Sequence, residues 1–204
     1  MRVVSFVAFG VLTTAAACGG KSQPAQTAEK TLPAENGLRS LEAFRDIADP
    51  AARSASIFEE IGKVLIHPRC SNCHPSDDRP RQRDGLAHHP LVVRGNDGSG
   101  APAMHCSNCH GTSNFEMMPG AANWHLAPLS MAWVGKSLPE ICEQVKDPAR
   151  NGGKTLKQII EHVTDDAFVA YGWSPPEHLE PAPGNQALFI QLVQGWVDAG
   201  AHCP

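Results

Sequence analysis

The pattern Cys-x-x-Cys-His occurs twice in this chain, with its first cysteines 36 residues apart. The two copies consist of Cys70, Cys73, His74, Cys106, Cys109 and His110. Two cysteines three residues apart lie on one side of a helical turn, where both sulfurs can form thioethers with the vinyl groups of one porphyrin. The histidine that follows then lies below the macrocycle, with a ring nitrogen directed at the iron. The two copies therefore predict two covalently bound haem c groups.

A structural zinc site and a thiol redox site are the competing interpretations of these cysteines. Zinc ribbons separate their cysteine pairs by about 15–20 residues, whereas 32 residues lie between Cys73 and Cys106. Zinc also does not require a histidine directly after each pair. A thioredoxin-like site would be surrounded by a βαβ pattern, which neither copy has. Two full copies of the pattern favour haem.

Each haem iron has a sixth coordination position, for which histidine and methionine side chains are candidates. His88 and His89 follow His74 by 14 and 15 residues at the end of a loop, which suits the first haem. His125 and Met131 follow the second motif by 15 and 21 residues and flank an apolar segment, which suits the second haem. The alternative for each is a surface histidine or a methionine that fills a gap in the core. Three further histidines are assigned to helices or to the surface: His162, His178 and His202.

Two cysteines remain outside the motifs and the N-terminal segment. Cys142 and Cys203 can close a disulfide in an oxidising compartment, which would tie the C-terminus to the middle of the chain. The alternative is two buried free thiols that pack as small apolar side chains.

Residues 1–17 have the form of a secretory signal peptide, in which an apolar run follows Arg2 and small residues lead up to Cys18. Cys18, followed by two glycines, resembles the lipidated first residue of bacterial lipoproteins, although Ala15 stands where those signals usually have leucine. A conventional signal peptide, cleaved before Cys18, would release the same N-terminus without a lipid. We expect a periplasmic protein, anchored to the membrane by a lipid on Cys18, with residues 18–50 as a flexible tether.

Helices are expected where apolar residues recur at helical spacing next to capping signals. Ser137 and Thr155 each begin a capping box, Asn185 can cap the last helix, and Gly200 ends it. The expected helices span residues 51–66, 138–145, 156–163 and the segment between Asn185 and Gly200.

Long loops are expected over residues 75–104 and 111–135, which are dense in proline, glycine or isolated apolar residues. No stretch alternates with period two. The fold class is therefore mostly α, cytochrome c-like, with two c-type haems wrapped by short helices and long loops in a domain of residues 51–204. The net charge of -4, without a dense basic run, indicates no nucleic-acid partner.

The chain resembles a family of small bacterial dihaem cytochromes labelled isoquinoline 1-oxidoreductase subunit, over about residues 50–204. The matching segments are His67-Pro68-Arg69-Cys70, Val92-Val93-Arg94-Gly95 with Asp97 and Gly98, Trp124-His125-Leu126-Ala127-Pro128, Met131-Ala132-Trp133, Ile141-Cys142-Glu143-Gln144, Lys146-Asp147-Pro148 and Asn151-Gly152-Gly153-Lys154. The resemblance implies His88, in preference to His89, as a haem ligand. It also implies a partner: a periplasmic molybdenum hydroxylase that passes its electrons to c-type haems.

We therefore expect a chain that transfers electrons from a dehydrogenase to a downstream cytochrome or oxidase, with no catalytic residue of its own. One alternative is a haem enzyme, peroxidase-like or acting on a sulfur compound, with one five-coordinate iron. Another is a haem-based ligand-binding protein. The chain holds no molybdopterin or iron-sulfur pattern, so the oxidation of any heterocycle would belong to another subunit.

Overall fold

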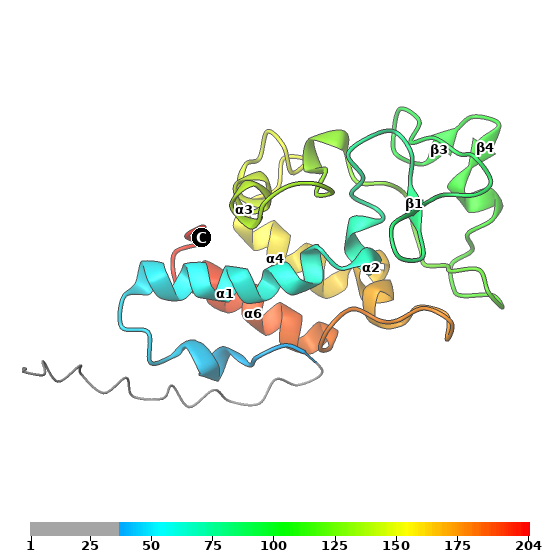
Figure 1. Ribbon diagram of the computed structural model, residues 1–204. Coiled ribbons are helices and arrows are strands. Elements are labelled where there is room, and N and C mark those ends of the chain that lie inside the picture. The colour runs from blue at the N-terminus through cyan, green and yellow to red at the C-terminus, as the bar shows by residue number, and fades with distance from the viewer. Residues whose placement is uncertain (1–36) are drawn as a thin grey trace, which may run out of the picture. The chain divides into compact units, whose positions relative to one another are not determined.

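The structure, a computed structural model, describes residues 37–204 (Figure 1). The expected signal peptide of residues 1–17, Cys18 and the first part of the tether lie outside the described residues. The α-helices are α1 (Pro50–Leu65), α2 (Pro68–Ser71), α3 (Leu138–Lys146), α4 (Leu156–Asp165), α5 (Ala167–Ala170) and α6 (Gln186–Asp198). The 3-10 helices are η1 (Leu41–Phe44), η2 (Cys106–Asn108), η3 (Leu129–Met131) and η4 (Tyr171–Trp173). The described part is thus mostly α, which confirms the expected class, and none of its helices is long and apolar enough to cross a membrane.

Helix α1 begins at a cap that the sequence supplies. The carboxylate of Asp49 accepts a hydrogen bond from the backbone N–H of Ala52 at 3.0 Å, and Pro50 occupies the first helical position. Proline is favoured there because its missing N–H would have no helical partner and its φ is already helical. Ile57 and Ile61, one turn apart, are both buried, so one face of α1 belongs to the core.

The two expected capping boxes begin α3 and α4. The Glu140 carboxylate accepts from the N–H of Ser137 at 2.8 Å, and the Gln158 amide oxygen accepts from the N–H of Thr155 at 2.9 Å. Asn185 caps α6 by accepting from a backbone N–H in its first turn at 2.8 Å. Each of these ends is fixed by residues within one turn of one another.

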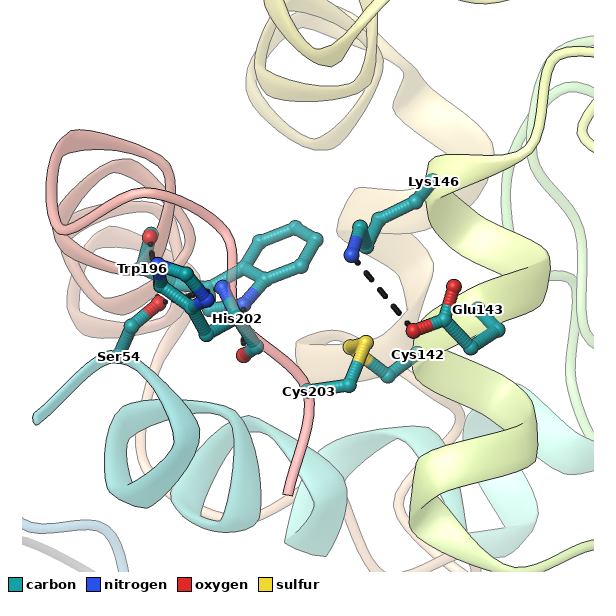
Figure 2. Close-up of a disulfide and its surroundings, with 7 residues drawn as sticks. All are labelled: Ser54, Cys142, Glu143, Lys146, Trp196, His202 and Cys203. Atoms are coloured by element: carbon teal, nitrogen blue, oxygen red, sulfur yellow. Dashed lines mark hydrogen bonds and ion pairs between the residues drawn. A yellow bond between two sulfur atoms is a disulfide. The ribbon is translucent and has the colours of Figure 1, made fainter. Parts of the chain in front are cut away.

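Helices α1 and α6 lie side by side at the centre of the hydrophobic core (Figure 1). The ring of Trp196 in α6 packs against Phe58 in α1, with centroids 5.0 Å apart. Ser54, fully buried, donates its hydroxyl to the Trp196 carbonyl at 3.0 Å and accepts from the N–H of His202 at 2.9 Å (Figure 2). Apolar contact and hydrogen bonds therefore both fasten the end of the chain to α1.

The packed part of the chain begins ahead of residue 51. Leu38 is completely buried, and Phe44 in η1 is 1% exposed. Arg39 donates through its backbone N–H and its Nε to the two carboxylate oxygens of Glu60, at 2.9 and 2.8 Å. The described end of the segment expected as a tether, residues 18–50, is thus part of the domain.

A disulfide joins Cys142 in α3 to Cys203, next to the C-terminus (Figure 2). The two Cα atoms lie 5.7 Å apart, and Cys142 is completely buried in the core. The bond pairs the two cysteines that lie outside the motifs and the N-terminal segment, and it fastens the chain end to α3 as well as to α1.

Residues 75–135 contain little regular structure and gather at one end of the helical part (Figure 1). They hold two antiparallel hairpins, β1 (Arg81–Gln82) with β2 (Leu86–Ala87) and β3 (Gly100–Ala101) with β4 (Met104–His105). Arg94, 7% exposed, donates to the carbonyls of Pro75, Asp77 and Ala127. One buried guanidinium therefore holds distant parts of this loop region together.

Candidate cofactor sites

The first Cys-x-x-Cys-His motif forms the turn that follows α1. Pro68 begins α2, and the Nδ1 of His67 caps this helix by accepting from the backbone N–H of Arg69 at 3.3 Å. The N–H of Cys73 then donates to the Cys70 carbonyl at 3.1 Å. The helical winding continues through the motif, as attachment of both sulfurs to one porphyrin requires.

The second motif repeats this winding without an α-helix. It follows β4 and begins in η2, where the N–H groups of Cys109 and His110 donate to the carbonyl of Cys106 at 3.1 and 2.8 Å. All four motif cysteines are free thiols, whereas Cys142 and Cys203 are bonded to each other. The motif cysteines are therefore available for attachment.

The two motif histidines are oriented by the same device. The Nδ1 of His74 lies 2.7 Å from the carbonyl oxygen of Met131, and the Nδ1 of His110 lies 2.7 Å from that of Pro119. A carbonyl oxygen can only accept, so Nδ1 carries the proton in each ring and Nε2 keeps its lone pair. A histidine that binds a metal commonly donates its other ring N–H in this way, which fixes the tautomer and the ring orientation.

A tryptophan ring lies parallel to each motif histidine. Trp133 stacks on His74 with centroids 3.4 Å apart and planes at 5°, and Trp124 stacks on His110 at 4.3 Å and 4°. A flat aromatic neighbour restricts rotation of the imidazole while leaving its in-plane lone pair free. Each histidine is therefore held by a carbonyl at Nδ1 and by an indole across one face.

Each motif borders a cavity. The first cavity encloses about 1220 Å³, including its open mouth, and is lined by the first motif and by apolar side chains of α1, α4 and α6. The second encloses about 1680 Å³ on the same measure and is lined by the second motif and by loop residues around 80–92 and 117–119. Arg69, Cys73 and His125 line both cavities, so the two sites share one wall.

Burial sets the protonation states at the motifs. It raises the pKa of the Cys70 and Cys73 thiols to about 12 and lowers the pKa of His74 to about 3. Burial also lowers the pKa of His110. At neutral pH the thiols keep their protons and the imidazoles are uncharged, which is the form that binds a metal. A thiolate redox site would need thiol pKa values shifted in the opposite direction.

The structure places His88 and His89 at the second cavity, although their spacing from His74 suggests the first. The ring of His88 lies 6.0 Å from that of His110, centroid to centroid, and its Nδ1 lies 3.0 Å from the Pro90 carbonyl oxygen. The number of residues between His74 and His88 predicts that this loop covers the site of the first motif. The hairpin of β1 and β2 instead reverses the chain and brings this segment to the second motif.

Met131 lies at the first motif, not at the second that its spacing suggests. It lines the first cavity, and its backbone carbonyl accepts from the Nδ1 of His74, so its backbone lies on the side of this ring away from Nε2. A sixth ligand must approach from the opposite side of the iron, which disfavours Met131 in that role. His125 lines both cavities, and its Nδ1 contacts the backbone carbonyl of Asn123.

Sequence analysis misses His162 as a site residue. Its place in the predicted helix α4 suggests a surface position, yet it lines the first cavity with Cys70, Cys73 and His74. The only sequence signal is its spacing: His162 follows Ile159 by three residues and precedes Val163 directly, and both of these are buried. A histidine on the apolar face of an amphipathic helix points toward the core side.

The residues present fit a covalently attached haem at each motif. Each site offers two free cysteines, a neutral histidine with a free Nε2, and a cavity that the motif borders. Beside the first cavity, the Nε of Arg69 and the Nε1 of Trp133 are buried donors without a partner among the described residues. Within residues 37–204 no three histidine, cysteine or acidic side chains gather as ligands for one ion.

Comparison of this chain with protein-family models, curated proteins and solved structures gives no match.

Proposed function

We propose that this chain is a c-type cytochrome with two covalently bound haems, mostly α and cytochrome c-like, that transfers electrons in the periplasm. The observation that carries the proposal is the duplicated site. Each Cys-x-x-Cys-His turn has free thiols, a motif histidine with Nδ1 held 2.7 Å from a carbonyl oxygen, and a stacked tryptophan. A surface turn with only a structural role does not require free thiols beside an oriented histidine, and this chain has that arrangement at both motifs.

The residues of the chain have distinct parts in this function. Cys70 and Cys73 would anchor the first cofactor, Cys106 and Cys109 the second, and the motif histidines would supply the proximal ligands. At the second site His88, whose ring lies 6.0 Å from that of His110, would supply the opposite ligand. The largely apolar lining of the first cavity would favour the less charged state of a bound metal centre.

Each bound haem supplies a one-electron couple between ferric and ferrous iron. Around neither cavity do the described residues present a nucleophile with an adjacent base that could act on a substrate. Burial keeps the Cys70 and Cys73 thiols protonated at neutral pH. Five histidines have Nδ1 within hydrogen-bonding distance of a carbonyl or carboxylate oxygen: His74, His88, His110, His125 and His162. These properties support electron transfer over substrate chemistry.

The partners follow from the family resemblance. We propose a periplasmic molybdenum hydroxylase, such as one that oxidises N-heteroaromatic compounds, as electron donor, and another cytochrome or an oxidase as acceptor. A lipid on Cys18 would hold the chain at the membrane. Mixing the oxidised cytochrome with such a hydroxylase and its substrate tests this, with rapid growth of the reduced haem spectrum as the expected result.

Haem content tests the proposal itself. Matured in a bacterial host with a cytochrome c assembly system, the chain should carry two haems by intact mass and by the pyridine haemochrome assay. Cys70→Ala with Cys73→Ala, or Cys106→Ala with Cys109→Ala, should carry one. Ser71→Ala, which lies between the two cysteines of the first motif and spares both thiols, is the matched control and should carry two. A folded, matured chain without haem would contradict the proposal.

Carbon monoxide separates an electron carrier from a haem enzyme or a ligand-binding protein. With protein ligands on both sides of each iron, the spectrum of the reduced protein should not change on addition of the gas. A rapid spectral shift would show an open position and favour an enzyme or ligand-binding role.

A further inference from the structure

We infer that His162, held by Asp166, is the sixth ligand of the iron at the first motif. The inference rests on the proposed function, since it requires a haem on Cys70 and Cys73. It assigns a residue that the spacing of the motifs does not indicate, and it makes both centres bis-histidine sites.

The position of His162 is the first argument. It lies on α4, and it lines the first cavity together with all three residues of the first motif. Its side chain is 40% exposed, so it borders the mouth of the cavity, where the outer side of a cofactor would lie. The Nδ1 of His74 is bound to Met131, which leaves the Nε2 of His74 for the cavity side.

The contact with Asp166 is the second argument. The Nδ1 of His162 lies 3.2 Å from the Oδ2 of Asp166, one helical turn further along the chain. A carboxylate accepts the Nδ1 proton, so Nε2 is the nitrogen left with a lone pair. Carboxylate–histidine–metal triads use this arrangement to orient the ring and to increase its strength as a ligand.

Asp166 is itself fixed, which makes this arrangement a rigid one. Its other oxygen, Oδ1, accepts from the backbone N–H of Phe168 at 2.8 Å and so caps α5. Helix α4 begins at the capping box of Thr155 and Gln158. His162 therefore lies on an element that is anchored at both ends, which suits a ligand whose distance from the iron must be held closely.

The other candidates at this cavity fit less well. The backbone of Met131 lies on the side of the His74 ring away from Nε2, as its carbonyl accepts from Nδ1. Lys154 would have to lose its proton before it could bind a metal. His125 is held by a backbone carbonyl in the loop and borders both cavities, whereas His162 borders the first alone. His125 is therefore the matched control for His162.

The spin state of the matured dihaem protein tests the inference. Electron paramagnetic resonance and absorption spectra of the wild type should show two low-spin haems. In His162→Ala half of the haem iron should become high-spin, and the reduced protein should bind one equivalent of carbon monoxide. Added imidazole should restore the low-spin state, and both haems of His125→Ala should stay low-spin.

Several outcomes would overturn the inference. Two low-spin haems in His162→Ala would do so, as would loss of the low-spin signal in His125→Ala alone. A wild type that already binds carbon monoxide at one haem while His162→Ala binds no more would do so as well. These results differ from failure of the proposed function, in which Cys70 and Cys73 carry no haem at all in the mass measurement.

Asp166→Asn gives a second test that does not remove the ligand. An amide is a weaker acceptor than a carboxylate, so the imidazole becomes a weaker donor to ferric iron and the midpoint potential of one haem should rise. Both haems should stay low-spin. Asp165→Asn, on the neighbouring residue, is the control and should leave both potentials unchanged. An unchanged potential in Asp166→Asn would contradict the positioning role of Asp166.

Discussion

The imidazole rings of His88 and His110 lie 6.0 Å apart, centroid to centroid, with their planes at 64°. Two imidazoles that bind the same metal ion from opposite sides, each at about 2 Å, have ring centroids about 6 Å apart. The Nδ1 of each ring lies within hydrogen-bonding distance of a backbone carbonyl oxygen, at 3.0 Å for His88 and 2.7 Å for His110. The two histidines thus have the spacing and the tautomers of a ligand pair.

His88→Ala should open the iron at the second motif. We expect half of the haem to become high-spin and to bind carbon monoxide in the reduced state, because the substitution removes the imidazole that faces His110. His89→Ala is the control, since His89 is the exposed neighbour in the sequence, and its spectra should match the wild type. Two low-spin haems in His88→Ala would exclude His88 as the ligand.

Loss of the disulfide should destabilise the chain strongly. Cys142 and Cys203 are 61 residues apart in the sequence, and closing a loop of this length stabilises the fold by about 4 kcal/mol in the chain-entropy model. Cys142→Ser with Cys203→Ser should lower the free energy of unfolding in urea by about this amount. Adding dithiothreitol to the wild type should have the same effect, and an unchanged denaturation midpoint would contradict the prediction.

Glu60 should contribute a stability that is lost in acid. Burial alone would raise its pKa, but hydrogen bonds from Lys63 and Arg39 outweigh it, and the pKa lies below its ordinary value. The contribution is present above the unfolded pKa of about 4.3 and disappears as the pH falls through the lower folded value. Glu60→Gln should lower the free energy of unfolding at neutral pH by about 2 kcal/mol.

The difference between Glu60→Gln and the wild type should shrink as the pH falls below about 4, when measured by urea unfolding. Glu59→Gln is the control, because Glu59 is exposed on the same helix and should show little change at any pH. A destabilisation that stays constant down to acid pH would show that the charge of Glu60 is not the cause.

Arg94 should hold the loops of residues 75–135 in a fixed conformation. Arg94→Met removes the donors to three carbonyls of residues 75–127 and should cost about 3 kcal/mol of stability. Limited proteolysis should then cut residues 75–135 faster than in the wild type. Arg79→Met, which changes an exposed arginine of the same loop, should be cut at the wild-type rate.

The sequence predicts the helices well because their signals are local. The capping residues Ser137, Thr155 and Asn185 act within one turn, and α3, α4 and α6 begin directly after them. The hairpins of β1 to β4 have two-residue strands, which are too short for an alternating pattern to appear. Their presence depends on contacts across the loop, among them those of Arg94.

The two motifs can be predicted from the sequence because their residues lie within one turn. The ligands proposed for the opposite side of each iron, His88 and His162, cannot be predicted in this way. Cys70, Cys73 and His74 belong to one turn, so their spacing alone carries the geometry. His88 reaches the second motif, and His162 the first, through folding of a loop and docking of a helix. Distance along the chain says little about such contacts, which are made between elements far apart in sequence.

Arg69, Cys73 and His125 line both cavities, so haems bound at the two motifs would lie close enough for the charge of one to affect the other. An electron held on one side raises the cost of a second on the other side, since their repulsion is little screened in a protein interior. We therefore expect negative cooperativity, with two separated midpoint potentials even where both irons have the same pair of ligands. A donor that releases two electrons at a time would reduce the two haems one after the other, and the first electron would transfer more readily than the second.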